Sequence, residues 1–383
     1  MIYDCVIVGL GAMGSAALYQ LSKRNAAVVG IDRYAPPHVH GSTHGESRIT
    51  RQGIGEGSDY VPLALRSHEI WRELEAETGE HLLHEVGCLV MAGDEGRGQM
   101  HESAFFANSV AAAKKFGIAH EVLAGAALRE RFPQFVTTLG TVGYYEPGGG
   151  YVRPERCVAA NLTRARALGA EVRVGEVLGI EQTGGRVVVT TTGGTIEAKQ
   201  AIVSAGAWAR PLLGPPFDAV LAPTRQVMHW FEAEPAAVAM WQGAPVYIWM
   251  YDATNEGHFY GFPAIDGGTA IKVADETLGP PIDPDAVDRE IPESDSRRMY
   301  NAHLRGRMAG ITPRRVKAVT CLYTHAPKSR FVIGRHPAHE RILVVSACSG
   351  HGFKHSAGIG EAVAKRILGE PEELLTPFVP GAA

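Results

Sequence analysis

Apolar runs and helical periodicity alternate at the start of this chain. Residues 3–8 form a mostly apolar run of the kind that a buried parallel strand requires. Residues 12–24 place apolar side chains at helical spacing, and residues 27–32 form a second apolar run that ends in the acid Asp32. This order predicts a strand, a helix and a second strand, which together make a βαβ unit.

The rest of the chain divides into segments with either the helical or the strand pattern. Glycine pairs separate short valine-rich runs in the middle of the chain, which is typical of a strand meander. We expect helices at 69–77, 109–116, 153–169 and 283–308, a strand at 88–91, a meander over 171–204, antiparallel strands over 224–272, and a strand, a glycine-rich loop and a helix from 319 to 368.

Alternation of strands and helices at both ends predicts one dinucleotide-binding domain that is built from both termini. The fold class is α/β (α+β), a Rossmann-like domain with an inserted antiparallel-sheet domain for the substrate. The boundaries that we predict are 1–85, 150–215 and 318–383 for the first domain, and 86–149 and 216–317 for the second.

Composition and charge exclude several classes of protein. The 383 residues are 45% hydrophobic and 20% charged, which excludes a disordered chain, a collagen-like fibre and a coiled coil. A net charge of −4, without a long basic run, argues against a nucleic-acid partner. Five scattered cysteines indicate a reducing compartment. The apolar stretch 5–21 lacks basic flanks and contains three glycines, so we expect neither a signal peptide nor a membrane span, and a cytoplasmic enzyme.

Gly9, Gly11 and Gly14 form a G-x-G-x-x-G pattern between the first strand and the first helix. The first glycine permits a tight turn, the second lets a pyrophosphate approach the backbone, and the third lets helix and strand pack closely. Asp32 can accept hydrogen bonds from ribose hydroxyls and would repel a 2′-phosphate. The pattern alone leaves NAD and FAD open.

Four further segments separate these cofactors: residues 41–51 (GSTHGESRITR), 55–66 (GEGSDYVPLALR), 320–324 (TCLYT) and 349–354 (SGHGFK). Together with the glycine motif they resemble the monomeric sarcosine oxidase and N-methyltryptophan oxidase family, over nearly the whole chain and in the family's order. The resemblance implies a D-amino-acid-oxidase-like fold with FAD as the cofactor.

The resemblance also implies the residues around FAD. Cys321 matches the family cysteine that forms a thioether with the flavin; the alternative is a buried core cysteine, and the other four cysteines are expected only to pack. The predicted cofactor-binding residues are Gly9, Gly11, Gly14, Asp32, Arg33, Ser42, Thr43, His44, Val177, Cys321, Gly350, Gly352, Phe353 and Lys354.

The same match implies a substrate pocket. Arg51 and Lys354 would hold a substrate carboxylate, and Arg48 would lie beside the flavin. Lys272 matches the lysine that promotes reaction with oxygen, because an ammonium group stabilises negative charge developing on oxygen. The predicted catalytic residues are Lys272, Arg48, His351, Tyr260 and Tyr323. The structural alternatives are a solvated basic face for Arg48 and Arg51, a surface lysine for Lys272, and core packing for the two tyrosines.

Two histidine-containing patterns could suggest zinc. They are Cys348, His351 and His355, and the loop residues His38, His40 and His44. Neither set has an obvious fourth ligand, so we predict no metal site.

The chain departs from the family pattern at Glu276. The family has a histidine four residues after the lysine, whereas this chain has Glu276, preceded by Asp275. A side chain that enters the pocket would make its wall acidic and favour a substrate with an extra donor or positive group. A solvent-facing Glu276 is the alternative.

These observations predict a flavoprotein oxidase of secondary amino acids such as sarcosine, other N-substituted amino acids or iminodiacetate. The C–N bond is oxidised to an imine, which hydrolyses to an aldehyde and an amine, while O2 becomes H2O2. We expect a monomer. The alternatives are an FAD dehydrogenase that passes electrons to a partner protein, and a non-catalytic FAD-binding subunit.

Overall fold

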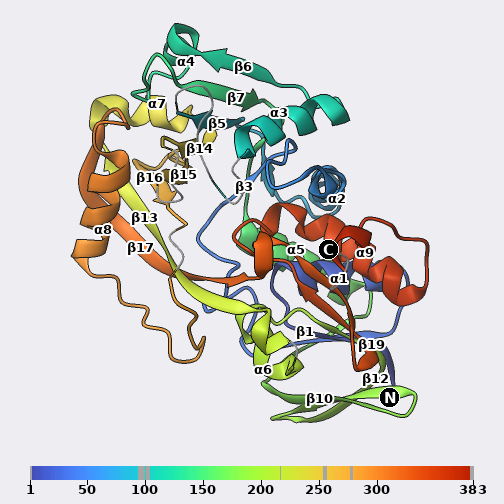
Figure 1. Cartoon of the computed structure of the whole chain (residues 1–383). Helices are drawn as coiled ribbons and strands as arrows, with labels where there is room; N and C mark the ends of the chain where they lie inside the picture. Colours follow the sequence, from blue (N-terminus) through green and yellow to red (C-terminus); the bar gives the residue numbers. More distant parts are fainter. Residues whose placement is uncertain are drawn as a thin grey trace.

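The computed structural model describes residues 2–93, 100, 104–215, 217–252, 257–276 and 279–379. Two large sheets and one small sheet organise these residues (Figure 1). Two strands of the second large sheet, β13 (Ala222–Ala233) and β17 (Ile311–His325), run toward the first sheet.

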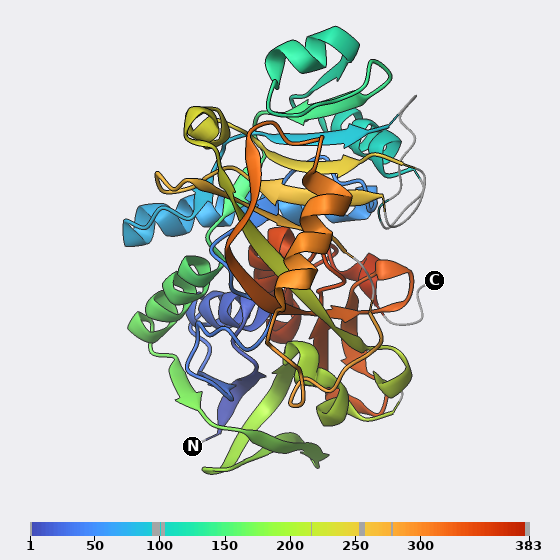
Figure 2. The ribbon, with the colours of Figure 1, turned by 90° about the vertical axis from the view of Figure 1, so that its left-hand side faces the viewer.

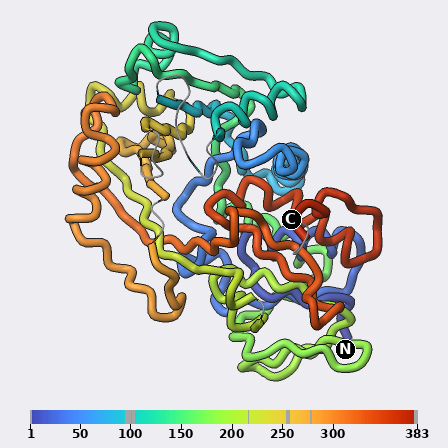
Figure 3. Tube along the Cα trace, viewed as in Figure 1, coloured from blue at the N-terminus to red at the C-terminus, as the bar shows by residue number. Residues whose placement is uncertain are grey.

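The first sheet has a parallel centre. β1 (Tyr3–Val8) lies between β2 (Val28–Asp32) and β12 (Gly194–Val203), and both neighbours run parallel to it. Its remaining strands are β9 (Glu171–Val174), β10 (Val177–Thr183), β11 (Arg186–Thr191), β18 (Val332–His336) and β19 (His339–Ser346). β19 joins β12 in parallel, so both ends of the chain meet in one sheet, as the blue and red segments of Figure 3 show. The predicted fold class is confirmed.

Helices pack closely beside this sheet (Figure 1). They are α1 (Ala12–Lys23), α5 (Pro154–Ala167) and α9 (Ser356–Leu368), and α2 (Val61–Thr78) packs in turn on α9 and α5. A Cβ on Gly360 would lie 2.5 Å from the Cβ of Ala16, so α9 and α1 cross with their backbones in near contact. The C-terminal helix therefore braces the helix that begins at the glycine motif.

The second sheet has the order β17-β13-β16-β15-β14-β5-β7-β6. Its shorter strands are β5 (Cys88–Ala92), β6 (Glu121–Ala124), β7 (Val142–Glu146), β14 (Val246–Met250), β15 (His258–Phe262) and β16 (Ala270–Ala274). Its pairs are antiparallel, as predicted, except that β14 runs parallel to β5. Its helices are α3 (Phe105–Phe116), α4 (Gly125–Arg131), α7 (Val238–Gln242) and α8 (Glu293–Met299), which lies over β13 and β17 (Figure 2).

The remaining elements are short. The third sheet consists of β3 (Arg48–Thr50), β4 (Leu83–His84) and β8 (Gly150–Val152). The short helices are η1 (Ser58–Tyr60), η3 (Gly206–Trp208), α6 (Ala209–Leu213), η4 (Phe217–Ala219), η5 (Pro235–Ala237), η6 (Tyr300–Leu304), η7 (Pro327–Ser329), η8 (Phe353–His355) and η9 (Thr376–Phe378). Within the described part of the chain, every helix is too short or too polar to cross a lipid bilayer.

Two sequence-based elements need correction. The predicted helix 283–308 is wrong in its first half, because the α-helix covers only Glu293–Met299 and a π-helical turn continues to Leu304. Pro284 and Pro292 restrict the backbone before each of them to extended conformations, which keeps that half irregular. The meander 171–204 is only partly right: β10, β11 and β12 are antiparallel, but β9 leaves them and pairs parallel with β2.

Candidate active site

The glycine motif closes the turn between β1 and α1. Gly9 has φ +88°, and a Cβ there would lie 2.5 Å from the carbonyl oxygen of Ser204. A Cβ on Gly14 would lie 1.8 Å from the oxygen of Gly9. A Cβ on Gly11 would meet only Thr43 Oγ1, at 3.4 Å. Gly9 and Gly14 therefore let the chain pack, whereas Gly11 leaves its space to the adjacent cavity.

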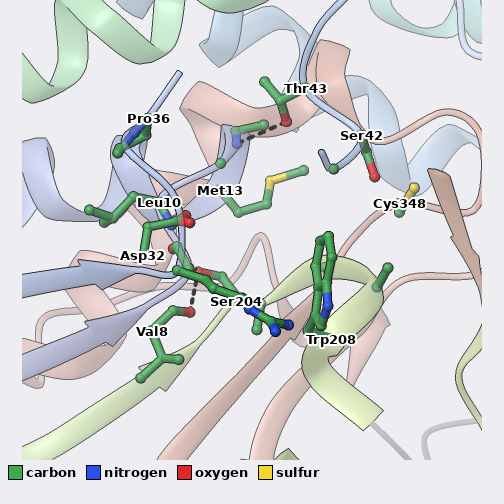
Figure 4. A pocket seen from close by; sticks show the side chains of 18 of the residues that line it. Val8, Leu10, Met13, Asp32, Pro36, Ser42, Thr43, Ser204, Trp208 and Cys348 are labelled. Carbon is green, nitrogen blue, oxygen red and sulfur yellow. Dashed lines mark hydrogen bonds between the residues drawn. The ribbon is translucent and has the colours of Figure 1, made fainter. Parts of the chain in front are cut away.

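That cavity has a volume of about 430 Å³ and extends from the end of β2 past the start of α1 to the loop before α9. Figure 4 shows Asp32, Thr43, Trp208 and Cys348 arranged around it. Of the predicted cofactor-binding residues, it is lined by Gly9, Gly11, Asp32, Arg33, Ser42, Thr43, Val177, Gly350, Gly352 and Phe353. The structure therefore brings together residues from both ends of the chain.

Asp32 is held at one end of this cavity. Its Oδ2 accepts the N–H of Leu10 at 2.7 Å, and its Oδ1 accepts the N–H of Tyr34 at 3.1 Å. The neighbouring Arg33 donates to Asp285 Oδ1 at 2.6 Å, and the indole N–H of Trp208 donates to the same oxygen at 2.8 Å. A residue of the segment between β16 and α8 thus closes the end where Asp32 lies.

A second, smaller pocket of about 60 Å³ adjoins the opposite end. Arg48, Tyr323, Gly350 and Phe353 line both spaces. The smaller pocket contains all the predicted catalytic and substrate-binding residues: Arg48, Arg51, Tyr260, Lys272, Glu276, Tyr323, His351 and Lys354. These side chains come from β3, β15, β16, β17, η8 and the loops beside them.

Glu56 connects the two residues predicted to hold a carboxylate. Arg51 pairs with Glu56 and donates to the carbonyl of Gly53 at 2.6 Å, while Lys354 Nζ lies 3.1 Å from Glu56 Oε1. Burial lowers the pKa of Lys354 to about 8, although the negative charge of Glu56 opposes this shift. The cluster holds two cationic side chains against one carboxylate, so it retains the capacity to bind an anion.

Lys272 is buried and oriented by backbone groups. Its Nζ donates to the carbonyls of Gly45 at 2.9 Å and Ser47 at 2.6 Å, and it lies 3.8 Å from the ring centroid of Phe262. Burial lowers its pKa well below the ordinary value, and the positive charge of Arg48 adds to the effect. This lysine therefore loses its proton at a lower pH than a surface lysine does.

Arg48 connects the segment 42–47 to Cys321. Its Nη2 donates to the carbonyl of Ser42 at 2.7 Å and lies 3.5 Å from the sulfur of Cys321. Burial raises the pKa of the Cys321 thiol, and the Arg48 guanidinium opposes that rise. Cys321 is 1% exposed, behind the wall that Ser42 and Arg48 form.

Cys348 corrects the expectation that the other cysteines only pack, because Cys348 itself lines the larger cavity. Its sulfur accepts the N–H of Thr324 at 3.4 Å. Cys5, Cys88 and Cys157 are fully buried among core residues. Two cysteine sulfurs therefore lie near the cavity.

The two predicted tyrosines meet directly, since the hydroxyls of Tyr260 and Tyr323 are 2.8 Å apart. Glu276 enters the pocket wall, which excludes the solvent-facing alternative. His351 places Nε2 2.9 Å from the carbonyl of Ser329, so that nitrogen carries hydrogen. His44 is buried outside both linings, and burial lowers its pKa to about 3.

Neither histidine pattern gathers into a metal-binding group. Among the residues that the structure describes, no three His, Cys, Asp or Glu side chains are arranged to hold a metal ion. His38 instead lies 3.3 Å from Asp32 Oδ1, and the ring of His40 stacks on Tyr34.

Comparison with known proteins identifies the type of cavity. The model of the family described as "FAD dependent oxidoreductase" matches residues 4–366. The chain belongs to the FAD-dependent oxidoreductase family. It is 36% identical to the monomeric sarcosine oxidase of Bacillus sp. (strain B-0618), over 98% of this chain and 95% of that one. It is 39% identical to the monomeric sarcosine oxidase of Streptomyces avermitilis, over 96% and 94%.

Two further proteins extend the comparison. N-Methyl-L-tryptophan oxidase of Yersinia pestis (strain Pestoides F) is 32% identical, over 98% of this chain and 97% of its own. The solved structure of NikD, described as an unusual amino acid oxidase essential for nikkomycin biosynthesis, superposes with a TM-score of 0.84 at 24% identity. That superposition covers 99% of this chain and 97% of NikD. It shows that the two proteins share a fold.

The residues of the larger cavity fit FAD. The first residues of α1 line this cavity and Gly11 gives them no side-chain cap, and a helix N-terminus of this kind binds pyrophosphate. Asp32 stands where a carboxylate meets ribose hydroxyls at the end of the second strand. The enzyme is therefore an FAD-dependent oxidoreductase in its residues as well as by family.

Several site residues escaped the sequence-based prediction. Glu56 lay inside a quoted segment, but nothing in its spacing indicated contact with Lys354. Ser204 and Trp208 follow β12, whose carboxyl end lies beside that of β1, and ligands bind at such strand ends. A predicted strand order would have found them. Asp285 lay within the wrongly predicted helix.

Proposed function

We propose that this enzyme oxidises secondary amino acids such as sarcosine, other N-substituted amino acids or iminodiacetate. The observation that carries the proposal is the buried cluster of Arg51, Glu56 and Lys354 in a pocket that shares its wall with the FAD cavity. Relatives named sarcosine oxidase and N-methyl-L-tryptophan oxidase, at 32–39% identity, support the same substrate class.

Each part of the pocket has a separate task in this proposal. Arg51 and Lys354 bind the substrate carboxylate and so orient the carbon beside nitrogen. Tyr260, Tyr323 and His351 form walls that exclude water. Bound FAD supplies the acceptor for hydride and the route to oxygen. The product imine hydrolyses to an aldehyde and an amine.

We propose oxygen as the electron acceptor, with H2O2 as the product. Lys272 supports this choice, because a buried ammonium beside the pocket stabilises negative charge on reduced oxygen. A dehydrogenase that passes electrons to a partner protein is the alternative. The pocket contains all four predicted cationic residues, which argues against a non-catalytic FAD-binding subunit. They are Arg48, Arg51, Lys272 and Lys354.

Further proposals concern the cofactor bond and the assembly. We propose that Cys321 binds FAD covalently, supported by its 3.5 Å contact with Arg48. The name of the sarcosine oxidase relatives supports a monomer. The predicted domain ranges and the cytoplasm remain predictions, and β17 runs through the predicted boundary at residue 318.

Rapid mixing of the purified enzyme with substrates tests the function. Sarcosine, N-methyl-L-tryptophan and iminodiacetate are each mixed with the enzyme in the absence of oxygen. The absorbance of the oxidised flavin is followed at roughly 450 nm. We expect at least one of these amines to bleach the flavin, and oxygen then to restore the colour with release of peroxide. Bleaching without peroxide would favour the dehydrogenase. Absence of bleaching with every N-substituted amino acid would contradict the proposal.

A further inference from the structure

Glu276 lies at the boundary between the FAD cavity and the substrate pocket. It follows β16, and its Oε1 stands 2.8 Å from the point that a Cβ on Gly350 would occupy. Gly350 lines both spaces and has φ +78°. Because Gly350 has no side chain, the Glu276 carboxylate can lie close to the backbone of the loop that lines both spaces.

The groups that face Glu276 come from three other elements. They are Tyr260 on β15, Tyr323 on β17 and Lys354 on η8. The Glu276 charge adds to the burial that raises the pKa of both tyrosines, and it opposes the burial that lowers the pKa of Lys354. Burial is the largest cause of the raised pKa values of both tyrosines, so both hydroxyls stay protonated at neutral pH. The pocket also contains Arg48, Arg51, Glu56, Lys272 and His351.

The charges of the pocket complement a zwitterion. Arg51 and Lys354 outnumber Glu56 by one positive charge, which a substrate carboxylate balances. Glu276 places a negative charge on a different wall segment, where it attracts an ammonium group of the substrate. The two charged groups of a zwitterionic amino acid can therefore each face a pocket charge of the opposite sign.

Oxidation of an amine requires the nitrogen lone pair. At neutral pH a secondary amino acid is an ammonium ion, with a pKa of about 10 for an alkylamine, so its lone pair holds a proton. Resting on the proposed function, we propose that Glu276 binds the substrate ammonium group and accepts its proton before the C–H bond breaks.

The step balances in atoms and electrons. The N–H bond breaks, its electron pair remains on nitrogen, and the proton forms an O–H bond on the Glu276 carboxylate. The neighbouring carbon then loses hydride, which carries two electrons, to bound FAD. The nitrogen lone pair forms the C=N bond of a cationic imine, which water hydrolyses.

The test uses Glu276→Gln, which keeps the size of the side chain and removes its charge, in the FAD-loaded enzyme. Asp275→Asn is the matched control, because Asp275 precedes Glu276 but pairs with His303 at 3.5 Å and does not line the pocket. Absorption spectra and thermal unfolding check that each variant folds and holds flavin. Anaerobic flavin reduction by sarcosine then gives kred and Kd from about pH 6 to pH 9, below the amine pKa.

We expect the ratio of kred/Kd in Glu276→Gln to that in the unmodified enzyme to rise nearly tenfold for each pH unit. Only the neutral amine reacts in the variant, and its fraction rises tenfold per unit below its pKa of about 10. Lys354 and Lys272 titrate in both enzymes, so dividing one kred/Kd by the other reduces the pH dependence that these lysines cause. Asp275→Asn should keep a constant ratio near one.

Methoxyacetate separates ammonium binding from carboxylate binding, because it carries an ether oxygen in place of nitrogen. Its Kd, followed by flavin absorbance over the same pH range, reports any altered titration of Lys354 directly. Glu276→Gln should weaken sarcosine binding about tenfold or more and leave methoxyacetate binding unchanged or tighter.

Two results would overturn the inference. A pH-independent ratio together with unchanged sarcosine affinity would show that Glu276 does not handle the ammonium proton, while the oxidase function stands. Failure of every N-substituted amino acid to reduce the flavin of the unmodified enzyme would overturn the proposed function, and the role of Glu276 with it. The first result is seen by comparing the variant with the unmodified enzyme, whereas the second is seen in the unmodified enzyme alone, so the two failures can be told apart.

Discussion

The guanidinium Nη2 of Arg48 lies 3.5 Å from the sulfur of Cys321, although 273 residues separate the two along the chain. A buried thiol loses its proton with difficulty, and burial raises the pKa of Cys321 accordingly. The adjacent positive charge favours the thiolate, which is the form that attacks an electrophilic carbon. The contact thus places a cysteine of β17 beside a cation at the wall of the FAD cavity.

Replacement of Cys321 by serine should release the flavin from its covalent bond. After acid precipitation we expect yellow colour in the pellet of the unmodified protein and of Cys348→Ser, and in the supernatant of Cys321→Ser. Absorbance of the two fractions measures this distribution. Colour lost from the pellet of Cys348→Ser alone would move the attachment to Cys348, which lines the cavity itself.

Replacement of Lys272 by methionine should slow flavin reoxidation by oxygen at least about tenfold and affect reduction much less, because a buried positive charge acts on the negative charge that develops on oxygen. Stopped-flow measurement of the two half-reactions separates the effects. Burial lowers the Lys272 pKa below its ordinary value of 10.5. The charged form exists below the pKa, so reoxidation should become slower as pH rises through it. Equal slowing of both half-reactions would contradict the assigned role.

Carboxylate binding should weaken as the pH rises through about 8, the pKa to which burial lowers Lys354. Below that pH the ammonium group is charged and attracts an anion, and above it the attraction is lost. Titration with methoxyacetate at pH values from about 6 to 10 measures the change in Kd around this pKa. Lys354→Arg should keep its charge throughout and bind with little pH dependence. Identical pH profiles for both enzymes would exclude Lys354 as the titrating group.

Two alanine substitutions in the glycine motif should affect different properties, one the stability of the fold and the other the FAD content. Gly14→Ala puts a Cβ 1.8 Å from the Gly9 oxygen and should cost about 3 kcal/mol of stability or more. Gly11→Ala meets only Thr43 Oγ1 at 3.4 Å, so the fold should persist while FAD content falls. Thermal unfolding and the flavin-to-protein absorbance ratio measure both effects. A stable Gly14→Ala protein with full FAD content would contradict this prediction.

Sequence patterns predicted the βαβ start well because most of its decisive contacts lie within the unit itself, although Gly9 also approaches Ser204. A Cβ on Gly14 would meet the oxygen of Gly9, and Asp32 at the end of β2 accepts the N–H of Leu10, so the spacing of these residues reflects a single geometry. The helix 283–308 failed for an equally local reason, since its polar pattern masked the restrictions that Pro284 and Pro292 impose.

The amino-acid sequence alone therefore determined the fold class, which short motifs and regular periods encode, and its resemblance to a known family implied the cofactor and the residue types of the pocket. The tertiary structure decided which side chains face one another. It joined Glu56 to Arg51 and Lys354, turned Glu276 toward Gly350, and brought Cys348 to the cavity. These relationships depend on how β16, β17 and the loop before α9 pack together, and no spacing along the chain records such packing.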